Sequence, residues 1–483
     1  MKSKGKSLGK NAFLNGFKNV LNLLFPLLTF PYVSKILSVE GIGQYNFAQA
    51  TVSYFSLIAG LGISSYAIRE GAKYRDDRNK FDTFASEVLL CNTISTIIAY
   101  LLLAFCMLFV DKLKSYALLI LVFSIQIVFT TIGIEWLYSI YEEYEYITVR
   151  SIAFKIISII LIFMFVKDSG DAVNYALITV FSSVGSNLLN LTHSKDYFHI
   201  VKVKLSDCAR HIKPILVIFA SNIAIMIYVY SDTTILGFMA TDYEVGIYSV
   251  SVKVYNIIKN LLSSVLIVSI PRLSMYYGSG RITDFKNTAQ KVYDSVTTLL
   301  LPAVVGLFCV SKNVILAISD VTYISAETSL KILCIALMFC IYGWFFSQCI
   351  LMPIKKENII LIATCISATV NIVLNFCLIP IWKEDAAAFT TLVAEFIMFV
   401  ICVVCGQNTA KIRLLGKNMC SVIIGCAAII WICKLILNSN MSMMLQLVAA
   451  VIASTIVYCI ILLLFHNEVV YILLRKVCHC HEK

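Results

Sequence analysis

The chain has 483 residues, of which 59% are hydrophobic and only 14% are charged, and its mean hydropathy is +0.86. Soluble globular chains are about half apolar and about a quarter charged, so the composition excludes that class and predicts an all-α polytopic membrane protein. We attribute the net charge of +11 to loops that contact anionic membrane lipids, and we expect no nucleic-acid binding.

Apolar windows of about 20 residues, the length that crosses a bilayer, recur along the whole chain. Charged and turn-rich breaks separate them into about 14 predicted transmembrane helices. These cover residues 12–37, 42–67, 84–110, 115–139, 147–166, 171–191, 214–238, 244–270, 292–310, 326–352, 358–380, 386–406, 418–437 and 444–465. No small-residue cleavage site follows the first apolar run, which is therefore predicted to be a span rather than a signal peptide.

Lysine and arginine set the expected orientation, because they accumulate in cytoplasmic loops. If the N-terminus is cytoplasmic, 27 of the 39 basic residues fall at the N-terminus, in the cytoplasmic connections and in the tail, 8 lie in the outer connections or at span edges, and 4 remain inside spans. Both termini are therefore predicted to be cytoplasmic.

The longest basic connection divides the first twelve spans into six and six, which predicts two parallel lobes. A short repeat supports this division, since "EGIGQY" (40–45) and "YEVGIY" (243–248) each lie between the first and second spans of a half; chance similarity is the alternative. The predicted parts are an N-lobe (1–191), a basic cytoplasmic linker (192–213), a C-lobe (214–406), spans 13 and 14 (407–465) and a cytoplasmic tail (466–483).

Chemistry on a substrate is not expected. There is no GxxxxGK[ST] motif, no soluble stretch long enough for an ATPase, and no plausible nucleophile–base set in the loops. Many of the 17 cysteines lie inside predicted spans, where cysteine acts as a small apolar residue. The tail sequence "CHCH" (478–481) does not have the spacing of a standard zinc motif. We expect neither a metal nor a cofactor.

The eighth span carries a polar face in an apolar helix. At 100° per residue, its polar side chains fall within a sector of ~140°. They are Ser249, Lys253, Asn256, Lys259, Asn260, Ser263 and Ser264. Lipid disfavours such a face, so it is predicted to line the bundle interior or a water-filled cavity.

The first two spans repeat this pattern. In the first, Asn11, Asn15, Lys18 and Asn22 fall within ~60°, and in the second, Asn46, Gln49, Ser53 and Ser56 fall within ~80°. Interhelical hydrogen bonds and snorkelling lysines are the structural alternative. The functional interpretation is a cavity, lined by Lys18, Lys253 and Lys259, for an anionic solute.

Three acidic residues also lie inside spans: Glu135, Asp232 and Glu395. Each could neutralise a lysine, which is the structural interpretation. The functional one is a protonatable carboxylate that couples transport to an ion gradient.

Three stretches carry a resemblance to a known family. Residues 21–72, beginning "LNLLFPLLTFPYVSKILSVEGIGQY", resemble the N-terminal signature of Wzx-type oligosaccharide flippases. Residues 134–180, beginning "IEWLYSIYEEYEYITVRS", resemble the fourth-to-sixth-helix region of those flippases, and "DAAAFTTLVAEF" (385–396) is similar to their twelfth-helix motif. These flippases belong to the polysaccharide-transporter branch of the multidrug/oligosaccharidyl-lipid/polysaccharide exporter superfamily.

The resemblance implies two six-helix lobes around a cationic cavity, and a multi-pass protein of the bacterial cytoplasmic membrane. It implies flipping of an undecaprenyl-diphosphate-linked oligosaccharide by alternating access, coupled to a gradient of H⁺ or Na⁺. Other polysaccharide-assembly proteins are implied partners. Related lipid II flippases have essential basic residues on the first, second and eighth helices. Here the second helix offers only Asn46 and Gln49, which leaves its charge contribution open.

Two other functions remain open at this point. A multidrug or toxic-compound extruder would have a similar architecture, but buried carboxylates would suit its cationic drugs better than these lysines do. A membrane glycosyltransferase or polymerase would need a catalytic acidic pair or a large outer loop, whereas the outer connections here are short.

Overall fold

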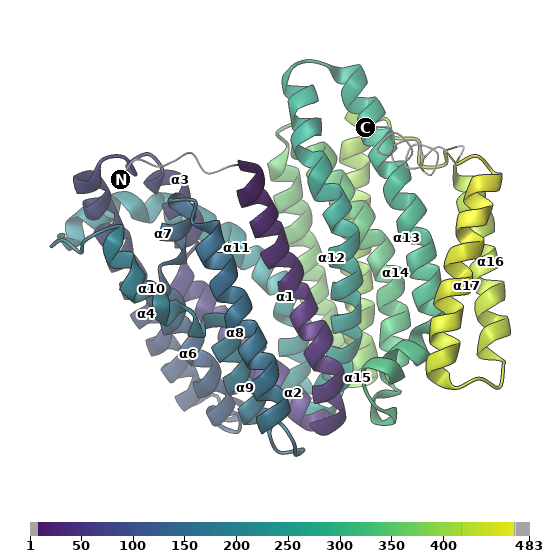
Figure 1. Ribbon diagram of the computed structural model, residues 1–483, viewed down its shortest axis with the longest axis horizontal. Helices are drawn as coiled ribbons and strands as arrows, with labels where there is room; N and C mark the ends of the chain where they lie inside the picture. Colours follow the sequence, from purple (N-terminus) through teal and green to yellow (C-terminus); the bar gives the residue numbers. More distant parts are fainter. Residues whose placement is uncertain (1–7, 417, 468, 470–483) are drawn as a thin grey trace. The chain divides into compact units, whose positions relative to one another are not determined.

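The computed structural model describes residues 8–416, 418–467 and 469, and these residues are helical apart from short connections (Figure 1). All fourteen predicted spans fall on helical segments. Within the described residues, eleven helical segments are long and apolar enough to cross a membrane, and Ala117–Gly133 is a shorter apolar helix. The all-α membrane fold is therefore confirmed, whereas the count of fourteen spans and the sides of the termini stay predictions.

The described residues form two compact units, divided between Gly246 and Ile247. The first unit holds α1 (Leu8–Ile36), α2 (Val39–Gly60), α3 (Ile63–Gly71), α4 (Arg78–Phe109), α5 (Asp111–Lys114), α6 (Ala117–Gly133), α7 (Glu135–Ile140), α8 (Tyr144–Phe165), α9 (Ala172–Val180), a π-helical turn (Phe181–Gly185), α10 (Asn187–His193), a 3₁₀ turn (Ser194–Asp196) and α11 (Leu205–Met239). The predicted linker 192–213 thus holds the end of α10 and the start of α11. The predicted lobe boundaries remain predictions.

Left-handed residues divide two of the predicted spans. The second span is broken at Leu61 (φ 44°) and Gly62 (φ 74°), so that α2 and α3 are separate helices. The fourth is broken at Ile134 (φ 45°), between α6 and α7. In each break the residue that ends the helix, Leu61 or Ile134, takes a left-handed conformation that is uncommon for a residue other than glycine. Apolar periodicity continues through these breaks, so it did not locate them.

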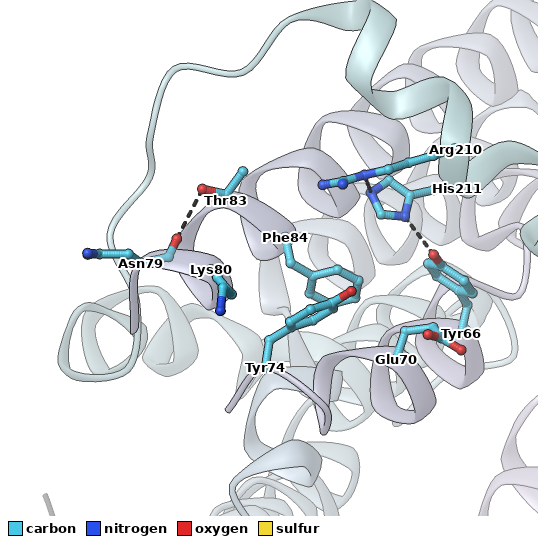
Figure 2. A pocket seen from close by; sticks show the side chains of 9 residues that line it. All are labelled: Tyr66, Glu70, Tyr74, Asn79, Lys80, Thr83, Phe84, Arg210 and His211. Atoms are coloured by element: carbon cyan, nitrogen blue, oxygen red, sulfur yellow. Dashed lines mark hydrogen bonds between the residues drawn. The ribbon is translucent and has the colours of Figure 1, made fainter. Parts of the chain in front are cut away.

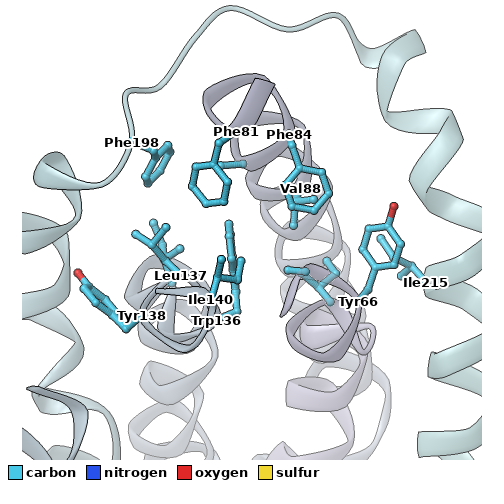
Figure 3. Packing of buried hydrophobic residues seen from close by; sticks show 14 of the residues in the cluster. Tyr66, Phe81, Phe84, Val88, Trp136, Leu137, Tyr138, Ile140, Phe198 and Ile215 are labelled. Atoms are coloured by element: carbon cyan, nitrogen blue, oxygen red, sulfur yellow. The ribbon is translucent and has the colours of Figure 1, made fainter. Parts of the chain in front are cut away.

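One end of the first unit contains an aromatic-rich core (Figure 3). The short helices α3 and α7 pack on each other and on α4 and α8 respectively. The core side chains shown in Figure 3 include Tyr66, Phe81, Phe84, Val88, Trp136, Leu137, Ile140, Phe198 and Ile215. Because these large side chains are nearly fully buried, the core fixes the start of α4 against α3 and α7.

A buried asparagine joins four helices of the first unit. Asn190 of α10 is fully buried, and its amide nitrogen donates to the carbonyl oxygen of Gly133 at 2.6 Å. Its side-chain oxygen accepts from Arg150 of α8, and its backbone carbonyl accepts from the hydroxyl of Tyr138 of α7 at 2.7 Å. Buried polar groups in an apolar bundle need such partners. Arg150 is therefore a structural residue of this unit.

The two glycine motifs of the short repeat meet in the first unit. Gly43 lies in the first turns of α2, and Gly246 lies in the first turns of α12 (Asp242–Gly278). A Cβ at Gly43 would overlap the backbone of Asp242, and a Cβ at Gly246 would overlap the backbone of Val39. The side-chain amide of Gln44 also donates to Asp242 at 3.0 Å. Glycine is required at both positions because the two backbones touch.

The second unit continues α12 and adds α13 (Ile282–Ile318), a 3₁₀ turn (Val321–Tyr323), α14 (Ala326–Trp344), a π-helical segment (Phe345–Leu351), α15 (Glu357–Ala410), α16 (Met419–Leu437) and α17 (Met443–Leu464). The predicted ninth span, 292–310, is the middle of α13, which continues on both sides of Pro302. Helices α16 and α17 pack side by side and on α13, where the Tyr458 hydroxyl donates to the carbonyl oxygen of Thr298 at 2.7 Å (Figure 1).

Helix α15 contains both the eleventh and the twelfth predicted spans. It is interrupted at Lys383 (φ 51°), where the chain reverses. Across this reversal, the Thr390 hydroxyl donates to the side-chain oxygen of Asn375 at 2.6 Å and accepts from the side-chain nitrogen of Asn371 at 3.4 Å. All three side chains are buried, so they hold the two arms of α15 together.

Candidate functional site

The lysine of the first polar stripe is paired with a carboxylate of its own unit. Lys18 Nζ of α1 lies 2.5 Å from Glu135 Oε1 at the start of α7, with 24% and 45% of the two side chains exposed. Because both groups remain partly open, other ligands can reach them. The structure thus brings together two residues that the sequence assigned to separate roles. The side chains of Asn11, Asn15 and Asn22 lie outside the described residues.

A second lysine of the first unit was missed as a site residue. Lys155 of α8 is half-buried, its Nζ lies 5.7 Å from the centroid of the Phe25 ring, and its charge interacts with that of Lys18. The sequence does contain a pattern that indicates this residue. Polar side chains recur at helical spacing on one face of this helix, namely Thr148, Ser151, Lys155 and Ser158. Two cationic side chains therefore lie near each other on α1 and α8.

The amides of the second stripe, on α2, are half-buried. The side-chain nitrogen of Asn46 donates to the carbonyl oxygen of Ile42 at 2.8 Å, and the Ser53 hydroxyl donates to the carbonyl oxygen of Gln49 at 2.7 Å. Asn46 thus bonds to its own helix, while its side-chain oxygen can still accept hydrogen bonds.

In the second unit, Lys259 of α12 faces a buried carboxylate on α15. Its Nζ lies 3.7 Å from Glu395 Oε1, and the side chains are 30% and 5% exposed respectively. The Tyr255 hydroxyl donates to the same carboxylate at 3.1 Å, and Lys259 Nζ also lies 5.4 Å from the centroid of the Tyr255 ring. Glu395 therefore has a charged ion-pair partner and a neutral hydrogen-bond donor, as a buried carboxylate requires.

The other residues of the eighth-span stripe differ in how far they are exposed. Lys253 is half-buried, whereas Asn256 and Asn260 are exposed.

The third acidic candidate, Asp232 of α11, is buried with 7% of its surface exposed. Among the described residues, no three histidine, cysteine, aspartate or glutamate side chains are grouped in a way that could hold a metal ion. The "CHCH" tail lies outside those residues.

The fold and the half-buried polar stripes define a multi-pass, all-helical membrane protein. Residues 8–277, more than half of the chain, match the model of the family described as "Polysaccharide biosynthesis protein". The chain belongs to that family.

Two relatives carry the name "Putative O-antigen transporter". One, from Escherichia coli (strain K12), is 27% identical over 270 residues, which are 56% of this chain and 65% of the relative, a little under two thirds of its length. The other, from Shigella dysenteriae, is 24% identical over 400 residues, which are 80% of this chain and 97% of the relative.

Solved structures share the fold at low sequence identity. A structure of the lipid II flippase MurJ in an inward closed conformation has a TM-score of 0.78 and 15% identity, and the match covers 95% of this chain and 99% of that one. An inward-facing multidrug resistance MATE family transporter of the MOP superfamily has a TM-score of 0.55 and 13% identity, over 80% of this chain and 94% of that one. The expected superfamily fold is therefore confirmed.

Proposed function

We propose that this protein is a flippase that moves an undecaprenyl-diphosphate-linked oligosaccharide from the inner to the outer leaflet of the bacterial cytoplasmic membrane. The observation that carries the proposal is the set of half-buried lysines on α1, α8 and α12, together with half-buried amides on α2, in a family whose relatives are named as O-antigen transporters. In apolar surroundings, such charges are costly and mark a substrate path.

The chemistry of the substrate fits these residues. A diphosphate cannot cross hydrocarbon bare, while its prenyl tail can remain in lipid. Lysine binds phosphate as a point charge, and amides supply both donors and acceptors for sugar hydroxyls. The proposed substrate-binding residues are Lys18, Asn22, Asn46, Gln49, Lys253, Asn256, Lys259 and Asn260. Lys155 joins this set, since it lies close to Lys18.

The two lysine–carboxylate pairs suggest how binding is linked to an ion. Glu135 contacts Lys18 and Glu395 contacts Lys259, so each carboxylate competes with a diphosphate for the lysine beside it. A proton on the carboxylate would remove that competition and leave the lysine to the substrate. We propose that Glu135, Glu395 and the buried Asp232 are the ion-coupling candidates of an alternating-access cycle driven by H⁺ or Na⁺.

The test is transport by the purified protein in proteoliposomes. Lipid-linked oligosaccharide from the source bacterium is incorporated, and its appearance in the opposite leaflet is followed with a membrane-impermeant glycosidase, with and without an imposed proton gradient. We expect the wild type to move it and a Lys18→Gln, Lys259→Gln double variant to lose transport at equal protein level. Extrusion of cationic drugs without glycolipid movement would instead favour a multidrug transporter, and chemical change of the glycolipid would favour a glycosyltransferase or polymerase.

A further inference from the structure

A cavity of about 500 Å³ lies in the first unit, and none of the stripe lysines lines it (Figure 2). It is bounded by α3, by the turn between α3 and α4, and by the first turns of α4 and α11. Tyr66 and Phe84 belong both to its lining and to the aromatic core beneath it, so this wall is held in place by packing. The connection between α3 and α4, which borders this cavity, carries several of the basic residues from which the cytoplasmic side of the membrane is predicted.

A buried chain of polar groups fixes one wall of the cavity. The carboxylate of Glu87 is 3% exposed and accepts hydrogen bonds from Arg210 and from His211 Nε2, the latter at 2.7 Å. The other ring nitrogen, Nδ1, lies 2.6 Å from the hydroxyl oxygen of Tyr66, and the two atoms share a hydrogen bond. The chain from Glu87 through His211 therefore fixes the Tyr66 hydroxyl at the cavity wall.

The charges around the cavity are balanced by neighbouring opposite charges. This distinguishes it from an anion site, in which unpaired cations converge. The pairs are Glu70 with Lys73 at 2.6 Å, Lys80 with Asp77 at 2.9 Å, and Arg210 with Glu87. The ligand best matched to such a lining is neutral and rich in hydrogen-bonding groups.

Aromatic rings supply the apolar part of the lining. The Tyr74 and Phe84 ring centroids are 5.4 Å apart with their planes inclined at 38°, and the Tyr66 and Phe84 centroids are 6.3 Å apart. Tyr74 is half-buried, and Asn79 and Arg210 are exposed at the rim. Aromatic faces contact the C–H faces of a pyranose, while amide and guanidinium groups bond to its hydroxyls.

We propose that this cavity binds a neutral sugar ring, namely part of the saccharide of the lipid-linked oligosaccharide, before the substrate crosses the membrane. Small-molecule sites are typically a few hundred Å³, and this volume has room for one or two pyranose rings. The identification of the sugar as part of the transported glycolipid rests on the proposed function. The lysine stripes bind the diphosphate, and this cavity binds the glycan.

Binding to the full-length protein in nanodiscs tests the two parts separately. The probes are the glycan released by mild acid from the lipid-linked oligosaccharide of the source bacterium, and undecaprenyl phosphate, which has no glycan. The variants are Tyr74→Ala, which removes a ring, and Asn79→Ala, which removes an exposed amide. The controls are Tyr74→Phe, which keeps the ring, and Phe109→Ala, at an exposed aromatic residue at the other end of α4.

We expect the Kd for the released glycan to rise at least tenfold in Tyr74→Ala and several-fold in Asn79→Ala, with little change in either control. The Kd for undecaprenyl phosphate should stay the same in all four variants. The proposal is overturned if the wild type does not bind the released glycan, or if Tyr74→Ala and Asn79→Ala bind it as tightly as the wild type. It is also overturned if these variants weaken undecaprenyl phosphate binding instead, which would make the cavity a lipid-headgroup site. Transport of the intact glycolipid by the wild type tests the proposed function independently of this result.

Discussion

Removing the charge of Lys259 tests whether this lysine serves the substrate or only the fold. The 3.7 Å separation of Lys259 and Glu395 corresponds to about 4.5 kcal/mol of attraction at an effective dielectric constant of ~20. Lys259 is 30% exposed, so we expect a smaller coupling energy, about 2–3 kcal/mol. Lys259→Gln leaves the carboxylate of Glu395, 5% exposed, with the Tyr255 hydroxyl as its neutral donor, and should lower the unfolding temperature markedly.

Adding Glu395→Gln to Lys259→Gln should restore most of that stability, because two amides can bond to each other without a buried charge. The assay is a double-mutant cycle of thermal unfolding in nanodiscs, with transport of the lipid-linked oligosaccharide measured on the same four proteins. If Lys259 binds the diphosphate, the double variant is stable but does not transport. A double variant that recovers both stability and transport would refute the reasoning and make the pair structural.

Three further predictions concern charge, coupling and packing. Lys253→Arg should retain much of the transport and Lys253→Gln should lose it at matched protein level, with a larger loss for a diphosphate-linked substrate than for a neutral lipid-linked sugar of equal size. Glu135→Gln or Asp232→Asn should abolish gradient-dependent flipping while glycolipid binding remains measurable, if that carboxylate is the coupling residue; normal flipping by both variants, and by the Glu395→Gln variant above, would place coupling elsewhere. Gly246→Ala should destabilise the contact with Val39 by about 1–3 kcal/mol, which is the usual cost of overpacking, and unchanged thermal unfolding would contradict the close approach.

Residues within one helix could be assigned from the sequence to a common face. The stripe on α12 is an example, because Lys253, Asn256 and Lys259 are related by the helical repeat alone. What that face contacts could not be predicted in this way. Glu395 lies on another helix and was one of three acidic candidates, and only tertiary packing of α12 against α15 selects it as the partner of Lys259.

Tertiary structure also revealed the proposed sugar cavity. Tyr66, Glu87 and His211 come from three different helices, and none of them forms a motif with its sequence neighbours. Side chains that meet through packing leave no periodic signal in the chain.

Membrane insertion, helix content and the polar stripes were determined by the sequence alone, because hydrophobicity and a 3.6-residue repeat are local properties. Helix breaks at Leu61 and Ile134 were decided by the fold, since an apolar environment favours unbroken helices and only contacts with other segments stabilise left-handed residues within them. The break at Lys383, in contrast, lies in the connection predicted between the eleventh and twelfth spans. The fold also decided the pairing of Lys18 with Glu135. A charge inside a span needs a partner, but which one it obtains depends on which helices pack together.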